Sequence, residues 1–267
     1  MVMITSTFYI EALGNDKKAV ETSILEIERK IKREKNVEVL EVVREDIIET
    51  EDPKLKYSAV LEAKIRGDLE NIVDVLLRYG PSIVEIEDVS GNEIHAEKLV
   101  KILAKVSAFM GKLIDAFGSL AAYPDLSKLP RPKIGYSDEE IEEMIIDKGL
   151  IRYRLVVELF GKSQQEIEEN FIRALSLEGA FINKFASKIV NEEDINGVRR
   201  VKLLFALELL SNLETLFIFT AKLSPIAIVI IEPEYIEITP NELQNSLSEL
   251  AAIINELVHR PLILSSS

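Results

Sequence analysis

The same pattern of residues occurs twice in this chain, and this internal repeat limits the fold more than any other feature of the sequence. Residues 8–14, with the sequence FYIEALG, return as residues 155–161, with the sequence LVVELFG. Later in each half, five apolar residues recur at spacings of four, three, four and three. They are Leu99, Leu103, Val106, Met110 and Leu113 in the first half and Leu243, Leu247, Leu250, Ile254 and Leu257 in the second. Because this spacing predicts one face of a long helix in each half, the chain is a duplication of one structural unit.

Each half contains the same order of predicted elements. In the first half, residues 4–13 are rich in β-branched and aromatic types and alternate in polarity, which favours a strand. A helix follows, because the apolar residues Val20, Ile24, Ile27 and Ile31 lie on one stripe. The remaining elements are strands at about 37–49 and 55–65, a short helix at about 69–79 (213–223 in the second half) and a strand at about 82–88 (226–232).

The order β-α-β-β-α-β, followed by a long helix, predicts an α+β fold of two tandem ferredoxin-like repeats. Right-handed crossovers place the two short helices of each repeat on one face of its sheet. We expect the long helix of each half to cover the other face. The predicted domains are residues 1–118 for the first repeat with its long helix, 119–149 for a proline-rich linker with a short acidic helix, and 150–267 for the second repeat with its long helix.

Several helix starts and turns carry residues that suit those positions. Ser137 and Thr239 are each followed three residues later by glutamate, which is the pattern of a capping box. His95 occupies the position of Thr239 in the first half, so we expect it to cap a helix and not to bind a metal. Residues 196–197, Asn-Gly, tolerate positive φ at both positions and predict a tight hairpin.

Composition excludes several classes of protein. The chain has 267 residues, of which 47% are hydrophobic and 29% are charged, which suits two packed domains. A formal net charge of −14 disfavours nucleic acid as a partner. Lys222, Ser224 and Pro225 interrupt the apolar run at 216–231, so we expect no membrane span. The absence of cysteine excludes disulfides and thiolate metal sites and fits a cytoplasmic protein, while abundant Glu, Lys, Ile and Val are typical of thermophilic proteins.

One charged pattern recurs on strands in both halves. Glu11 and Glu62 lie in the first and third predicted strands of the first half, and Glu158 and Glu208 lie in the same strands of the second. These two strands are neighbours at the centre of a ferredoxin-like sheet. Carboxylates that share a face and approach within about 8 Å could bind a hard cation or a polar ligand, or act as an acid/base pair. The alternative is that they face solvent or form ion pairs with neighbouring basic side chains.

The loops between the first strand and the first helix form a second candidate site. They contain Gly14 and Asn15 in the first half and Gly161 and Lys162 in the second. A helix N-terminus suits an anion, although a turn followed by a helix cap explains the same residues. On these loop glycines and the βαββαβ order, residues 4–90 and 150–232 resemble the regulatory ACT-like domains. The resemblance implies tandem domains that associate through sheets or helices and bind amino acids near this loop.

The sequence therefore favours a non-catalytic protein, either an oligomeric assembly or a small-ligand-binding regulatory module, with no cofactor, catalytic residue or metal. The candidate ligand-binding residues are the four glutamates and four loop residues named above. The alternatives are a metal-dependent enzyme that uses the repeated carboxylates and an adaptor that acts through the acidic helix of the linker. Because residues 226–231 are apolar at every position, we expect that strand to be buried on both faces. A homodimer or larger homo-oligomer, with the second repeat near the interface, would provide the cover.

Overall fold

The computed structural model describes residues 2–51, 54–118, 126, 128–195 and 198–264. Contacts between residues divide the chain into two compact units. Unit 1 comprises Met1–Glu93 together with Ile238–Ser267, and unit 2 comprises Ile94–Glu237. Each unit therefore contains one of the two repeats and one long helix.

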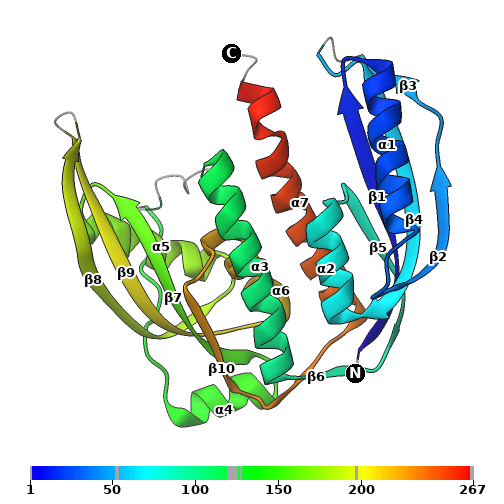
Figure 1. Ribbon diagram of the computed structural model, residues 1–267. Coiled ribbons are helices and arrows are strands. Elements are labelled where there is room, and N and C mark those ends of the chain that lie inside the picture. The colour runs from blue at the N-terminus through cyan, green and yellow to red at the C-terminus, as the bar shows by residue number, and fades with distance from the viewer. Residues whose placement is uncertain (1, 52–53, 119–125, 127, 196–197, 265–267) are drawn as a thin grey trace. The chain divides into compact units, whose positions relative to one another are not determined.

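Unit 1 is an antiparallel sheet with two helices packed on one face (Figure 1). Its elements are β1 (Met3–Gly14), α1 (Lys17–Ile31), β2 (Glu38–Arg44), β3 (Ile48–Glu49), β4 (Tyr57–Asp68), α2 (Leu69–Tyr79), β5 (Ile83–Ser90) and α7 (Pro240–Leu264). The strand order is β2-β4-β1-β5, and β3 pairs with β4. Phe8 and Ile10 of β1 and Leu61 and Ile65 of β4 are buried. They form the core beneath α1 and α2, because alternate strand residues point to the same face.

Unit 2 repeats this architecture. Its elements are α3 (Ala96–Phe117), α4 (Asp138–Ile146), β7 (Ile151–Gly161), α5 (Gln164–Leu177), β8 (Phe181–Ile195), β9 (Val198–Ser211), α6 (Leu213–Leu223) and β10 (Ala227–Glu232). The strand order β10-β7-β9-β8 matches that of unit 1 strand by strand. Two short strands, β6 (Glu93–His95) and β11 (Tyr235–Glu237), pair with each other where the chain passes between the units.

The predicted α+β class and the order of elements in both halves are confirmed. The short helices α2 and α6 have the predicted bounds. The strand predicted at 37–49 is instead two strands, β2 and β3. The hairpin predicted at residues 196–197 lies outside the described residues, although β8 and β9 pair up to Ile195 and Val198 on either side of it.

The predicted helix caps are present. The Ser137 hydroxyl accepts from the backbone N–H of Glu140 at 3.2 Å, and the Glu140 carboxylate accepts from the backbone N–H of Ser137 at 2.9 Å. Thr239 and Glu242 form the same reciprocal pair at the start of α7. His95 caps α3, since its Nδ1 accepts from a backbone N–H in the first turn at 3.2 Å. These local signals were reliable because each joins groups only a few residues apart.

The two long helices are exchanged between the repeats, and the predicted boundaries at residues 118 and 150 are corrected accordingly. α3 follows the first repeat but contacts α6 and β10 in unit 2, whereas α7 follows the second repeat but contacts β5 and α2 in unit 1. The expectation that each long helix covers its own sheet is therefore wrong. The physical reason lies in the connections. A short extended strand, β6 or β11, precedes each long helix, whereas a reversing loop would be needed to return the helix to its own sheet.

α7 protects the outer edge of β5 with polar side chains. The Gln244 amide accepts from the backbone N–H of Ile86 at 2.7 Å and donates to the carbonyl of Val84 at 2.7 Å. Further along the helix, Asn255 donates to the carbonyl of Pro81 at 2.6 Å. These amides supply the hydrogen bonds that a neighbouring strand would otherwise make. The β5 edge of the unit 1 sheet is thus closed by a helix.

The matching edge strand of unit 2, β10, is not buried on both faces as its apolar sequence predicted. Val229 is 55% exposed, and Ile226, just before the strand, is 63% exposed. α3 contacts β10, and a pocket of about 410 Å³, lined by residues that include Ala104 and Gly111, lies between them. The strand is the outermost in its sheet, and apolar side chains on it stay exposed in the single chain. The reason for expecting an oligomer therefore remains, and the oligomer stays a prediction.

Each sheet also has a face opposite its two short helices. In unit 1 these helices are α1 and α2, and in unit 2 they are α5 and α6. On β1 this face carries Thr7, Tyr9 and Glu11, which alternate with core residues. On β7 it carries Arg154 and Val156, along with the other even-numbered residues of the strand. We call these surfaces open face 1 and open face 2. One end of open face 2 is covered by α4.

Candidate functional site

A buried carboxylate, Glu208 on β9, lies at the centre of a charged cluster in unit 2. The residue is 1% exposed. Its Oε1 accepts from Nε and Nη2 of Arg152 at 3.0 and 2.7 Å and from the Asn183 amide at 2.8 Å. Its Oε2 accepts from Nε and Nη2 of Arg154 at 3.0 and 2.9 Å, and the Lys184 ammonium lies 3.5 Å from the same oxygen. Two guanidinium groups therefore hold one carboxylate.

These contacts fix the charge of Glu208. Burial would raise the pKa of Glu208, but hydrogen bonds from Arg152, Asn183 and Arg154 outweigh it and lower the pKa to about 2. The hydrogen bond to Glu208 in turn raises the pKa of the Arg152 guanidinium. A carboxylate with so low a pKa is a poor proton acceptor near neutral pH. Glu208 is therefore an anchor for the two arginines and not a catalytic base.

Strand geometry explains how these side chains meet. Arg152 and Arg154 are two residues apart on β7 and project from the same face. Glu208 lies directly opposite Arg154, and Lys184 of β8 lies opposite Glu208. An irregularity in β8 just before Lys184 inserts Asn183, whose amide then reaches the carboxylate.

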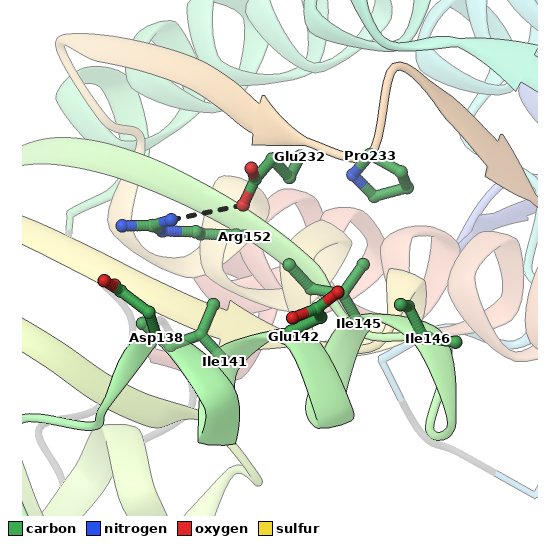
Figure 2. A pocket seen from close by; sticks show the side chains of 8 residues that line it. All are labelled: Asp138, Ile141, Glu142, Ile145, Ile146, Arg152, Glu232 and Pro233. Carbon is green, nitrogen blue, oxygen red and sulfur yellow. Dashed lines mark hydrogen bonds and ion pairs between the residues drawn. The ribbon is translucent and has the colours of Figure 1, made fainter.

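Arg152 also lines a pocket between α4 and the ends of β7 and β10. Glu232 on β10 accepts from Nη1 of Arg152 at 3.1 Å. The pocket has a volume of about 420 Å³, within the usual range for small-ligand sites. Its lining residues are Asp138, Ile141, Glu142, Ile145, Ile146, Arg152, Glu232 and Pro233. Figure 2 shows the α4 side chains rising toward Arg152 and Glu232, with the guanidinium toward the Asp138 end and Pro233 toward the Ile146 end.

α4 forms one wall of this pocket because its apolar side packs on the sheet. Ile141 and Met144 are buried against Leu210 of β9. Just before the helix, the backbone N–H of Tyr136 donates to Oδ1 of Asn183 at 3.1 Å. The same asparagine therefore connects the start of α4 to the Glu208 cluster. The acidic helix of the predicted linker is a packed part of unit 2.

The predicted pair Glu11 and Glu62 lies on open face 1. Glu62 is opposite Tyr9, and Glu11 is opposite Val60. The two glutamates are therefore diagonal neighbours on one face, as predicted. Glu11 accepts from the Ser58 hydroxyl at 2.7 Å. Ligand binding by this pair stays a prediction.

The predicted pair Glu158 and Glu208 does not come together. Both lie on open face 2, but Glu208 is opposite Arg154, four residues from Glu158 along β7. At about 3.3 Å per residue, this separates them by about 13 Å. The prediction was wrong because it treated Glu62 and Glu208 as equivalent positions. Tyr9 faces Glu62, whereas its counterpart Val156 faces Ala206, so the third strand of unit 2 is shifted by two residues. Glu158 and Glu208 thus do not form the carboxylate pair on which the metal-dependent enzyme was based.

The loop glycines have a packing role. A Cβ at Gly161 would lie 2.5 Å from Cγ1 of Ile167, and one at Gly14 would lie 3.0 Å from a methyl carbon of α1. The first helix of each repeat therefore approaches the strand end closely enough to favour glycine. The next residues, Asn15 and Lys162, are exposed. Ligand binding at these loops stays a prediction.

Arg152, Glu142 and Glu232 were not predicted from the sequence. Two arginines alternating on an otherwise apolar strand were a usable signal, because side chains at that spacing share a face with a carboxylate on the neighbouring strand. Glu142 and Glu232 gave no such signal. These two residues line one pocket only because of how α4 packs on the sheet, and no local sequence pattern encodes that packing.

Within the described ranges, no three His, Asp or Glu side chains are grouped as they would be around a metal ion. In the same part of the chain, no helix combines the length and apolar character needed to cross a membrane.

The fold and the pocket define an α+β protein with two antiparallel sheets of matching strand order, exchanged long helices and a small pocket beside a buried ion cluster. The chain belongs to the MJ0538 family, whose model matches residues 5–264. It is 30% identical over 257 residues to "Uncharacterized protein MJ0538" of Methanocaldococcus jannaschii, an alignment that covers 93% of this chain and 95% of that protein. No solved structure matches the chain.

Proposed function

We propose that this protein is a non-catalytic small-ligand-binding module. Its unit 2 pocket binds a small molecule that carries an ammonium group on a branched aliphatic body, a class that includes aliphatic amino acids and amines. One observation carries the proposal: the carboxylates of Asp138, Glu142 and Glu232 share a single cavity with Ile145 and Ile146.

The polar part of the pocket favours a cation. Three carboxylates and one guanidinium line it, and that guanidinium already donates to Glu208 and Glu232. Glu232 is half exposed, so an ammonium group can reach it from solvent. Charge-assisted hydrogen bonds to Glu232 and Glu142 would stabilise the bound ammonium. A guanidinium has five N–H donors, so Arg152 retains donors that can reach the carboxylate of an amino acid.

The apolar part of the pocket favours an aliphatic body. Ile146 is 70% exposed, and Ile145 and Pro233 lie on the same side of the cavity. A ligand that covers these side chains gains roughly 25 cal/mol for each Å² of apolar surface removed from water. A branched chain of about four or five carbons is small enough to fit, together with its polar groups, in a cavity of about 420 Å³.

The architecture supports the same class of protein. Both sheets have the order second-third-first-fourth strand, which supports two ferredoxin-like repeats produced by duplication. ACT-like domains use such repeats to bind amino acids, and the proposed ligand belongs to that chemical class. The pocket, however, lies beside Arg152 at the start of β7, whereas the predicted loop site at Gly161 lies at its other end.

A thermal-shift comparison of three matched compounds tests the proposal. Leucine and isoamylamine both carry the ammonium group and the branched body, whereas isocaproate has a similar body without the amine. Leucine and isoamylamine should raise the melting temperature, because a ligand that binds only the folded state stabilises it. Isocaproate should leave the melting temperature unchanged.

Two variants and a neighbouring control locate the site. Glu142→Gln and Glu232→Gln should each remove the shift, since each deletes a carboxylate of the lining. Glu143→Gln changes an exposed glutamate of the same helix outside the lining and should retain the shift. Equal responses of the Glu142 and Glu143 variants, or no shift with either amine at millimolar concentration, would show the proposal to be wrong.

A further inference from the structure

The two open faces carry opposite charges at equivalent positions. Because the two sheets share one strand order, rows of residues across them can be compared directly. The row through Thr7 is Glu41, Lys64, Thr7 and Glu85, and the matching row of unit 2 is Lys184, Glu208, Arg154 and Val229. On the second strand of each repeat, Glu41 corresponds to Lys184. On the third strand the charges are reversed, because Lys64 corresponds to Glu208. The two faces are thus partly charge-inverted copies of each other.

The next row differs in size. In unit 1 it is Val43, Glu62, Tyr9 and Ile83, and in unit 2 it is Ala186, Ala206, Val156 and Ala227. Val43 and Ile83 are 44% and 54% exposed. The three alanines of unit 2 are also exposed. One face therefore projects large side chains where the other has a flat strip of small ones.

Open face 1 is acidic around its central tyrosine. The Tyr9 hydroxyl donates to Glu85 at 3.2 Å. Burial, together with the charges of Glu85, Glu62 and Glu87, raises the pKa of Tyr9. Lys64 contacts Glu87 and offsets part of this charge.

Open face 2 is basic, although the whole chain has a net charge of −14. Arg154 and Lys184 are 59% and 65% exposed at their side chains, and Lys188 is exposed on the same strand as Lys184. Glu208, which both contact, is buried beneath them. The accessible part of the cluster is therefore cationic.

We infer that open face 1 of one chain docks on open face 2 of a second copy. The acidic surface meets the basic one, and the projecting row of Tyr9, Val43 and Ile83 meets the alanine strip. A second copy is the occupant that the charges favour, since each chain carries one face of each kind. The contact is heterologous, because two different faces meet, so it links one copy of the chain to the next. Open face 2 shares Arg152 with the ligand pocket, but none of the residues substituted below lines that pocket, so the test is independent of the proposed function.

Two charge variants test this contact on the full chain by light scattering. Ala206→Glu places a negative charge in the middle of open face 2, where it would meet the acidic surface of the partner. Tyr9→Arg places a positive charge in the middle of open face 1. Each should weaken self-association about tenfold or more, because like charges are brought together. Leu177→Arg, at an exposed position at the end of α5, is the matched control and should associate as the unmodified chain does.

Mixing the two variants identifies which faces meet. The Ala206→Glu chain retains open face 1, and the Tyr9→Arg chain retains open face 2, so an equal mixture should form a complex of twice the 30.1 kDa chain mass. Circular dichroism establishes that each variant is folded. A monomeric unmodified chain at micromolar concentration would overturn the inference. So would a variant that still associates alone, or folded variants that fail to pair when mixed.

Discussion

Replacing Glu208 by glutamine should destabilise unit 2 by an amount that depends on pH. The side chain keeps its shape, but two arginines lose their shared carboxylate, and Arg152 is only 18% exposed at its side chain. A fall in pKa from the ordinary 4.5 to about 2 corresponds to about 3 kcal/mol of stability for the ionised form. We therefore expect the variant to be about 3 kcal/mol less stable than the unmodified chain at pH 7.

The direction of the pH dependence follows from the lowered pKa. A carboxylate with a lowered pKa in the folded state contributes its full stabilisation above its unfolded pKa, near 4.5, and loses it as pH falls toward about 2. In that interval the contribution falls by about 1.4 kcal/mol per pH unit. The difference between the two proteins should thus shrink from about 3 kcal/mol at pH 7 to about 1 kcal/mol at pH 3.

Urea unfolding followed by circular dichroism at several pH values measures this difference. The comparison between the two proteins is needed because other carboxylates titrate in the same range and contribute equally to both. Glu158→Gln is the control: its Lys202 partner at 2.6 Å forms a partly exposed ion pair, which is expected to contribute only about 0–1 kcal/mol. A stability difference for Glu208→Gln that stays constant from pH 7 to pH 3 would refute the assignment of Glu208 as an ionised anchor.

Three further substitutions probe packing and capping. Gly161→Ala should destabilise the chain by about 1–3 kcal/mol in urea unfolding, because its Cβ would lie 2.5 Å from a side-chain carbon of Ile167. Gln244→Ala should cost about 1–3 kcal/mol and speed hydrogen exchange of the Ile86 amide on β5, since it removes the side-chain oxygen that accepts from this N–H; unchanged exchange of Ile86 would contradict this role. Ser137→Ala should cost about 0.5–2 kcal/mol through loss of the α4 cap, and should weaken leucine binding if α4 forms the pocket wall.

Short-range features of the fold followed from the sequence. The bounds of α2 and the caps of α4 and α7 depend on residues within one or two helical turns, so local chemistry determines them. The strand order followed from the order of elements, because few topologies satisfy short right-handed connections.

Long-range features did not follow. The exchange of α3 and α7 depends on which sheet edge each helix reaches, and the apolar faces of the two helices are too alike to distinguish the alternatives. The two-residue difference in strand register moved Glu208 away from Glu158 and placed it beside Arg154. Register is set by packing over the whole sheet. A shift of two residues leaves every side chain on the same face, so the apolar pattern does not reveal the shift.

The comparison of the two repeats separates what the fold requires from what it does not. Because both sheets have one strand order, a residue that the fold needs should be the same in both halves, and this holds for Gly14 and Gly161. The fold does not need a particular charge on the open faces, since Lys64 and Glu208 occupy equivalent positions and each has a partner of opposite charge. The fold therefore leaves the charges of the open faces free to differ, and their complementarity is the physical reason to expect that the two faces contact each other.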